Sequence, residues 1–480
     1  MGHSNLSMNL LAKETICSLF IAILSFSFVF GLKVRILYLT VISIILLIWV
    51  VVFYCNKYVD RLITIFLLGH ILYGLSGPIV GRLYNSPILI NFYGSFPDHT
   101  WNSFLSAYTT GTLGIVCAIG VWSLWHIKPP YLNPVFADKL SRINERRNMA
   151  FIIASVALIF EFINFVRAGG TKSLFSGKAF YYHEVSQAYI TLPSTMLLSI
   201  AIYFYFRDFK DQDYKTINLL LFIAIIMLCN ITTFILGDRS TLGSLVIIGV
   251  MAYYYSNGLK ITKNVVISIL TVYFVLTIMF TVRSNTYLLF TPDGAKEFLG
   301  KYSIERIVLN LNPGNNEFQS SSYNFLKFYE DPMEYRYGFA YVTEMVQFIP
   351  RWLFPCKPVG LTTEYRNIYY PQYQITNQGA GYSSFVEGYL NFGYIGIFLH
   401  YAILAMACLY LDRNKKLNKS NLFGLMYVTT AYIFFRIHRS SSGIFASWIA
   451  IILALYMMVY VMKLITECVK KAIATIARNS

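Results

Sequence analysis

Charged side chains are scarce in this sequence. Asp, Glu, Lys and Arg together make up 13% of the 480 residues, whereas 56% of the residues are hydrophobic. An ordinary soluble domain carries about 25% charged residues, so the composition argues against that class. The net charge of +16 would suggest a nucleic-acid partner in a soluble protein. Here most Lys and Arg lie in short segments between apolar runs, so we expect them to orient a membrane protein, and we expect no nucleic acid.

Motifs for cofactors and metals are also missing. The seven cysteines form no CxxC pair and no Cys/His cluster with zinc spacing, which argues against a disulfide framework and a structural metal. No Walker-type phosphate loop and no HExxH motif occurs. Asp211 and Asp213 form the DxD pattern of nucleotide-sugar transferases, but they lie in a very short loop with no surrounding domain to make a site. We therefore expect no cofactor and no metal.

Long apolar runs are abundant instead. A membrane-spanning helix needs about 20 mostly apolar residues, and the sequence offers twelve candidate runs. The first run lacks a convincing cleavage site, so we interpret it as a retained span. The pattern predicts an all-α, polytopic bundle of about twelve transmembrane helices. The predicted spans are 15–31, 36–55, 62–80, 106–126, 149–166, 190–206, 217–236, 243–258, 264–282, 389–410, 422–437 and 441–462.

The distribution of Lys and Arg predicts the orientation. With both termini in the cytoplasm, more than half of the 39 Lys and Arg residues fall on the inner side, as the positive-inside rule requires. One long outer loop remains, and it is too rich in aromatic residues for a disordered segment, so we expect a folded cap on the bundle. The predicted domains are residues 1–282 with the first nine spans, 283–388 as the large outer loop, and 389–480 with the last three spans and the C-terminal tail.

Two polar segments at the outer ends of spans could carry chemistry. The first is GDRSTLG, in which Arg239 is a candidate anion ligand because guanidinium binds phosphate in a bidentate fork. The second is RIHRSSSG, in which Arg436 and Arg439 are spaced to share one helical face and His438 lies between them. Each segment also has a purely structural interpretation, as an interfacial turn or as a basic anchor.

A third polar segment, residues 379–393, closes the long loop and holds Glu387 at the expected boundary between water and lipid. A carboxylate there can serve as a base, or it can cap or neutralise a neighbouring arginine. The loop adds Arg283 and Arg351 as further candidates for anion binding. Glu161 is the one acidic residue well within a predicted span, where it either faces a polar cavity or is a buried structural partner.

These segments, the aromatic outer loop and the hydropathy profile together resemble Wzy-type O-antigen polymerases. The resemblance implies a GT-C-like membrane fold in the inner (cytoplasmic) membrane of a bacterium. It implies an undecaprenyl-diphosphate-linked oligosaccharide repeat as substrate, presented on the periplasmic face. The enzyme would transfer the growing glycan from its lipid diphosphate to an incoming repeat, without a metal or nucleotide. The expected partners are membrane lipids and, by family analogy, a chain-length regulator.

The resemblance also gives roles to the candidate residues. Arginines would stabilise the departing diphosphate, and Glu387 or His438 would position the acceptor hydroxyl or act as its base. Two alternatives stay open. An O-antigen ligase or another lipid-linked glycan transferase would share the donor and the leaving group. A flippase or transporter would carry more charge inside its spans and smaller outer loops. The candidate diphosphate ligands are Arg239, Arg436 and Arg439, with Arg351 and Arg283 behind them.

Overall fold

The structure of the chain is a computed structural model that describes ten stretches of the sequence and a few single positions. Every regular element in these stretches is an α-helix or a short 3₁₀ helix. The described part of the chain is therefore all-α, as the apolar runs predicted. The described stretches are residues 62–83, 98–125, 140–171, 191–207, 216–232, 239–257, 319–349, 353–373, 381–417 and 421–450.

Eight of the helices coincide with predicted spans. Three of them, over His99–Trp122, Glu145–Arg167 and Ser384–Lys415, are long and apolar enough to cross a membrane. The predicted spans 15–31, 36–55 and 264–282 lie outside the described residues, so the number of spans stays a prediction. The eight helices are α3 (Leu62–Leu83), α5 (Asp98–Trp125), α6 (Leu140–Arg167), α9 (Thr191–Phe206), α10 (Thr216–Cys229), α12 (Arg239–Asn257), α20 (Ser384–Leu417) and α21 (Asn421–Arg436).

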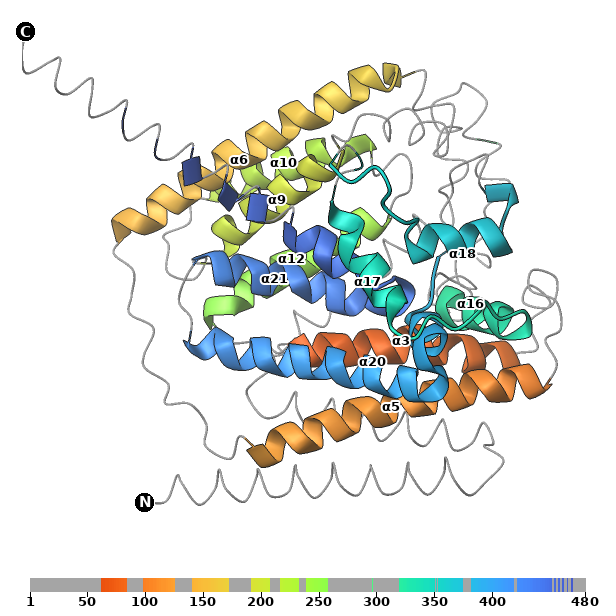
Figure 1. Ribbon diagram of the computed structural model, residues 1–480. Helices are drawn as coiled ribbons and strands as arrows, with labels where there is room; N and C mark the ends of the chain where they lie inside the picture. The colour runs from red at the N-terminus through yellow and green to blue at the C-terminus, as the bar shows by residue number, and fades with distance from the viewer. Residues whose placement is uncertain are drawn as a thin grey trace, which may run out of the picture.

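These helices lie lengthwise against one another (Figure 1). The long part of α20 packs along α5, α6 packs along α9, and α3 packs along α21. Glycine allows two of these pairs to approach closely. A side chain at Gly114 of α5 would collide with the backbone of α20 at Phe398, and one at Gly69 of α3 would collide with the backbone of α21 at Phe435. Small residues serve this purpose in membrane bundles, where close packing rather than the hydrophobic effect holds helices together.

Two carboxylates tie helices together inside the bundle. Glu161 of α6 accepts hydrogen bonds from Ser194 of α9 (3.0 Å) and from Thr232, just after α10 (2.7 Å). Glu161 is partly buried, and these hydrogen bonds make it a structural partner between helices. Asp412, near the end of α20, accepts hydrogen bonds from the first two backbone N–H groups of α3, at 2.8 and 3.3 Å. Asp412 thereby satisfies donors that the N-terminus of a helix leaves unpaired.

A sharp turn divides α20 into two helices. Phe392 and Gly393 have non-helical backbone angles, and Gly393 has a φ of 61° and a ψ of −143°. The chain reverses at this turn. Residues 384–391, the short arm, therefore fold back on residues 394–417, the long arm. The predicted span 389–410 thus includes the turn as well as part of the long helix.

The two arms of α20 are in direct contact. Gly388 of the short arm lies against Gly396 and Ile397 of the long arm, so a side chain at Gly388 would collide with the opposing backbone. The hydroxyl groups of Ser384 and Tyr401 lie 2.7 Å apart. The reversal therefore carries the start of α20 into the bundle, where its polar side chains are buried.

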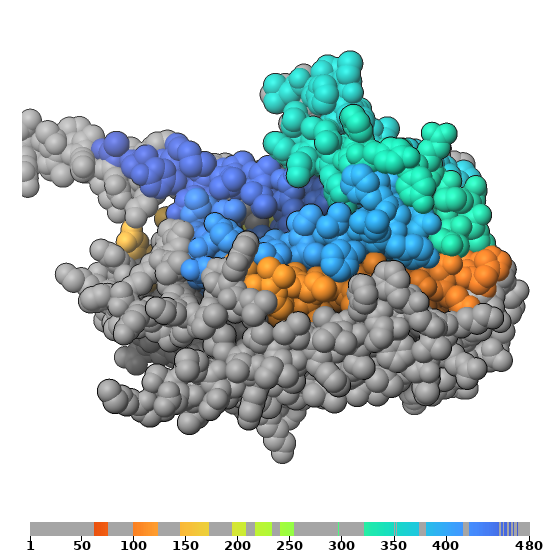
Figure 2. Space-filling view, turned by 60° about the horizontal axis from the view of Figure 1, so that its bottom comes forward, coloured from red at the N-terminus to blue at the C-terminus, as the bar shows by residue number. Residues whose placement is uncertain are grey.

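Short helices fold over this part of the bundle. α16 (Gln319–Glu330) packs on α3 and α5. α17 (Phe339–Met345) leads into the 3₁₀ turn η4 (Val346–Phe348), and α18 (Leu361–Tyr369) follows. Figure 1 shows α16 and α18 at one end of the bundle. In Figure 2, green and teal residues of this region protrude beside the blue α20.

Side-chain contacts lock α16 to α18. Tyr365 of α18 donates a hydrogen bond to the carbonyl of Asn324 in α16 (2.8 Å). Lys327 of α16 donates to the carbonyl of Tyr369 at the end of α18 (2.6 Å). Burial and the neighbouring Asp331 raise the pKa of Tyr369 to about 12, so its hydroxyl stays protonated at neutral pH and donates to the Asp331 carbonyl. These two helices are therefore joined by several side-chain hydrogen bonds.

Candidate active site

Two of the polar segments singled out in the sequence meet in the structure. The RIHRSSSG segment begins with Arg436 at the end of α21 and continues through the 3₁₀ turn η5 (Ile437–Arg439). It then enters the last described helix at Gly443, and this helix is described without interruption over residues 443–450, within the predicted span 441–462. Glu387 lies on the short arm of α20. Its carboxylate accepts hydrogen bonds from the backbone N–H of Ser442 (2.8 Å) and from the Ser442 hydroxyl. The two segments therefore form one site.

A second buried carboxylate holds the same turn. Glu344 of α17 accepts hydrogen bonds from the backbone N–H of Gly443 (3.1 Å) and from the hydroxyl of Ser441. Its other oxygen accepts from the N–H of Leu361, the first residue of α18 (2.5 Å). A side chain at Gly443 would collide with the Glu344 carboxylate. Glu344 therefore joins α17, α18 and the start of the last helix, and it requires glycine at the contact.

The two carboxylates, Glu344 and Glu387, gather here because both face the start of the helix that begins at Gly443. The first N–H groups of a helix have no partner within the helix, and the N-terminus carries partial positive charge. Glu344 and Glu387 are 2% and 0% exposed, so their oxygens are satisfied by these N–H groups and by serine hydroxyls rather than by water. Leaving such a buried acceptor without a partner would be costly. The pair thus fixes the backbone of residues 441–443.

His438 anchors the other end of the segment and is fully buried. Its Nε2 lies 3.0 Å from the carbonyl oxygen of Phe66 in α3. Because a carbonyl only accepts hydrogen bonds, Nε2 carries the hydrogen. Nδ1 then accepts from the hydroxyl of Tyr401, 3.4 Å away on the long arm of α20. Ser321 of α16 donates to the backbone carbonyl of His438 (2.5 Å). The neutral ring therefore connects the segment to α3 and the long arm, while its backbone is held by α16.

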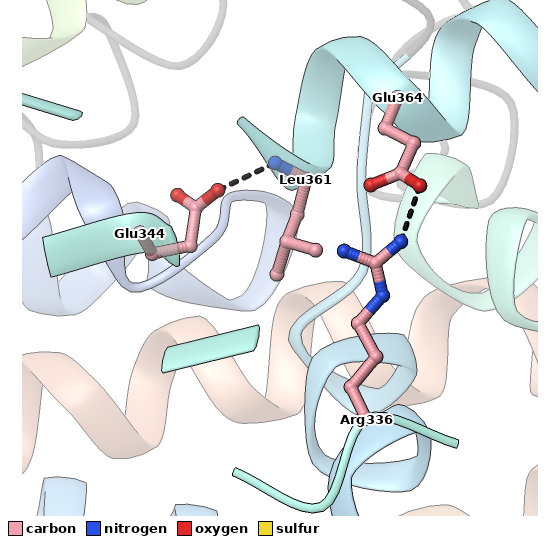
Figure 3. Close-up of polar contacts among 4 residues, drawn as sticks. All are labelled: Arg336, Glu344, Leu361 and Glu364. Carbon is pink, nitrogen blue, oxygen red and sulfur yellow. Dashed lines mark hydrogen bonds and ion pairs between the residues drawn. The ribbon is translucent and has the colours of Figure 1, made fainter. Parts of the chain in front are cut away.

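α18 and the turn of α20 are attached to the same site. Figure 3 shows Glu344 reaching the N–H of Leu361, while Arg336 forms an ion pair with Glu364 further along α18. The backbone N–H of Arg336 donates to the carbonyl of Leu390 in the short arm (2.8 Å). The ion pair is partly exposed, so it adds little stability by itself. The ion pair instead fixes the position of α18, because Arg336 is itself bonded to the short arm through its backbone.

Arg436 and Arg439 are the cations that the RIHRSSSG segment contributes. Both side chains are partly exposed, and they flank the buried His438. Arg436 donates a hydrogen bond to the hydroxyl of Tyr432, one turn earlier in α21 (3.3 Å). Arg439 ends η5, two residues before Ser441, which Glu344 holds. The backbone that carries both arginines is thus fixed on either side, while their side chains reach the surface.

The other three predicted anion ligands lie elsewhere or outside the described residues. Arg351 is exposed after η4 and donates to the carbonyl of Lys357 (3.3 Å). Arg239 is the first residue of α12, a helix that packs against α21. The side chain of Arg239 is not among those described, and Arg283 lies wholly outside the described residues. The roles of these three residues stay predictions.

Sequence reasoning missed Glu344 and the serine hydroxyls. In the sequence, Glu344 is one of several acidic residues in the long loop, and its partner Ser441 lies 97 positions away. Ser321, which holds the carbonyl of His438, lies 117 positions from it. Contacts between such distant positions leave no local pattern. The signal that could have pointed to them is the SSSG stretch, since serines before a helix start are typical of caps.

Apolar helices of spanning length, packed around a buried polar site, define the class: this is an integral membrane protein with a helical bundle. The profile of the family O-antigen polysaccharide polymerase Wzy matches residues 14–472. The chain belongs to this family, which confirms the resemblance seen in its motifs. No curated protein and no solved structure was found to match the chain.

Proposed function

We propose that the protein is an O-antigen polymerase that joins undecaprenyl-diphosphate-linked oligosaccharide repeats at the periplasmic face of the bacterial inner membrane. Membership of the Wzy family supports a polymerase that acts on a lipid-linked oligosaccharide. The apolar helices support a membrane location. The bond formed, the face of the membrane and the residue roles are parts of the proposal.

The proposed reaction sets two chemical requirements. A hydroxyl oxygen of the incoming repeat bonds to the anomeric carbon of the growing glycan. The bond between that carbon and the diphosphate oxygen breaks, and its electron pair leaves with the lipid diphosphate. The hydroxyl proton must also be taken up. The site therefore needs cations beside the leaving group and a group that places or deprotonates the acceptor hydroxyl.

The observation that carries the proposal is the rigid turn that presents Arg436 and Arg439. Two buried carboxylates and a buried histidine hold the backbone around these arginines. Guanidinium binds phosphate oxygens in pairs, and preorganised charge stabilises a leaving group without reorganisation. We propose that both arginines bind the diphosphate. Arg239, Arg283 and Arg351 are candidates for further contacts with it.

Glu387 and His438 act first as positioning residues in this proposal. Glu387 holds Ser442, and His438 holds the segment against α3. Glu387 also stays the candidate base. If the Ser442 hydroxyl lets go of the Glu387 carboxylate when the acceptor binds, the freed carboxylate oxygen can take up the proton of the acceptor hydroxyl. His438 has both ring nitrogens engaged, so the geometry favours a positioning role for it over acid–base catalysis.

Lipopolysaccharide gels test the function directly. A strain that lacks the gene should show the core with a single repeat, and the wild-type gene should restore a ladder. Arg439→Ala and Arg436→Ala should each lose the ladder or shorten it strongly, because the leaving group loses a cation. Arg413→Ala is the matched control, since this exposed arginine lies at the opposite end of α20 and should keep the ladder.

Other gel patterns would point to a different function. Bare core with lipid-linked polymer accumulating in the null strain would make the protein a ligase. Bare core with repeats trapped on the cytoplasmic side would make it a flippase. A full ladder from both arginine variants, at wild-type protein levels in the membrane, would remove these residues from diphosphate binding.

A further inference from the structure

α17 runs beside the membrane-spanning helix α20. The backbone N–H of Gly338, just before α17, donates to the side-chain oxygen of Asn391 (2.9 Å). One turn further along, the hydroxyl of Tyr341 lies 3.1 Å from Nδ1 of His400, and the two rings stack. His400 lies well past the turn, in the long arm of α20. α17 therefore lies alongside the long arm rather than beyond its end.

One face of α17 is apolar and exposed. Phe339, Val342 and Met345 are 72%, 57% and 65% exposed, and their spacing of three residues places them on one side of the helix. Phe348 of η4 continues the exposed apolar surface. The opposite side of α17 carries Glu344, which is buried in the site. These four apolar residues are called the α17 face below.

The neighbouring long arm exposes a surface of the same kind. Ile395, Leu399 and Ile403 are 71%, 45% and 65% exposed and lie four residues apart along the helix. On a helix that is long and apolar enough to cross a membrane, such a row faces lipid hydrocarbon. The contact between Tyr341 and His400 joins the two helices that carry these surfaces, so the α17 face extends an existing lipid-facing surface.

Several polar groups of this segment have partners within the protein, which lowers the cost of contact with hydrocarbon. Glu344 is the only charged residue between positions 339 and 350, and it points inward. Gln347 donates to the carbonyl of Thr343 (2.9 Å). Lys357 donates to the carbonyls of Gln347 (2.9 Å) and Ile349 (2.8 Å). Backbone oxygens that a short helix leaves unpaired at its end therefore have side-chain partners.

We propose that α17 and η4 lie in the membrane, with the α17 face in contact with the hydrocarbon chains of bilayer lipids. The long loop is then not only a cap in water, because part of it enters the lipid beside α20. Glu344 lies on the other side of the same helix. One side of α17 would therefore contact lipid, while the other side holds the turn of the candidate site. The proposal depends on the membrane location of the chain and not on the reaction that it catalyses.

Accessibility measured by electron paramagnetic resonance tests the proposal. Single cysteines replace Val342 or Met345 in the full chain, whose seven native cysteines are changed, and each carries a nitroxide label. The protein is reconstituted in phosphatidylethanolamine–phosphatidylglycerol vesicles, and collision rates with oxygen and with a water-soluble nickel chelate are measured. Ile395→Cys is the hydrocarbon reference, and Glu334→Cys, on an exposed loop position, is the water reference.

The expected result is a high oxygen collision rate at both positions, like that of the Ile395 label, with nickel collisions several-fold below those of the Glu334 label. Nickel collisions equal to those of the Glu334 label would overturn the proposal. Low collision rates with both reagents would also overturn it, since they would mean that protein, such as a second copy, covers the face.

A second measurement keeps the test open if the cysteine-free protein does not fold. A photoreactive benzoylphenylalanine at Val342 or Met345 of the otherwise native chain is irradiated in the same vesicles. Mass spectrometry should then find lipid adducts at both positions and none at Glu334. Absence of adducts at both positions, with adducts at Ile395, would contradict the proposal.

Discussion

At the residue scale, the candidate site is built from buried acceptors and the donors they satisfy. Glu344 and Glu387 accept from three backbone N–H groups and two serine hydroxyls. His438 is held by a carbonyl and a tyrosine hydroxyl. Each of these groups is costly to bury alone and stabilising when paired. Arg436 and Arg439 lie next to this polar framework, with partly exposed side chains.

Glu344→Gln tests this framework. The amide keeps one acceptor oxygen but presents an NH₂ group to N–H or hydroxyl donors, which leaves at least one buried donor without a partner. We expect a loss of about 1–3 kcal/mol in the free energy of unfolding and, if the proposed function holds, a shortened ladder. Thermal unfolding in detergent measures the first effect, and lipopolysaccharide gels measure the second.

Glu334→Gln is the matched control for that variant. Glu334 is exposed on the same loop, and surface substitutions usually change stability by less than about 0.5 kcal/mol. Equal unfolding midpoints for Glu344→Gln, Glu334→Gln and the wild type would mean that Glu344 does not hold the turn.

At the element scale, the reversal of α20 determines where Glu387 lies. A straight helix would carry the start of α20 away from the bundle. Instead the turn at Phe392 and Gly393 folds the short arm back, and the close contact between Gly388 and Gly396 lets the two arms touch. Glu387 reaches Ser442 only because of this reversal. The geometry of one glycine therefore controls the position of a candidate site residue.

Gly393→Ala tests that control. With φ of 61° and ψ of −143°, Gly393 occupies a backbone region that residues with a Cβ atom rarely adopt. We expect alanine to lower the free energy of unfolding by about 1–3 kcal/mol, measured by thermal unfolding in detergent. Gly120→Ala in α5 is the control, because a side chain there meets only open space and alanine favours helix. Equal free energies of unfolding for Gly393→Ala and Gly120→Ala would show that position 393 accepts a Cβ atom without strain.

The same turn shows why the sequence predicted the site only in part. Apolar runs predict helices from composition alone, so eight of the described helices coincide with predicted spans, whereas the short helices α16, α17 and α18 of the long loop do not. The motifs around Glu387 and His438 were visible because their polar residues are clustered in an apolar sequence. The reversal at Gly393 was not predicted, because glycines are frequent in transmembrane helices and mark no turn by themselves. Glu344 was missed because its partners are distant along the chain.

At the scale of the whole molecule, the two ends of the bundle differ. One end carries α16 and α18 (Figure 1). At the end of the long arm, Asp412 meets the start of α3, and Arg413 and Lys415 follow within the same helix. Basic residues at helix ends favour the cytoplasmic side. The arrangement is thus compatible with the orientation predicted from the distribution of Lys and Arg, in which the long loop faces the periplasm.

Cysteine labelling in cells tests this orientation. Glu334→Cys and Arg413→Cys are made in a background without the native cysteines, since both positions are exposed. In cells with a permeabilised outer membrane, a membrane-impermeant maleimide should label Glu334→Cys almost completely and leave Arg413→Cys nearly unlabelled. After lysis, both should react. We expect this pattern because each Lys or Arg near the anionic inner surface of the membrane is attracted to it by about 1 kcal/mol, which favours the cytoplasmic side for the basic end of α20. The opposite labelling pattern would reverse the orientation and place the candidate site on the cytoplasmic side, where a periplasmic polymerase could not act.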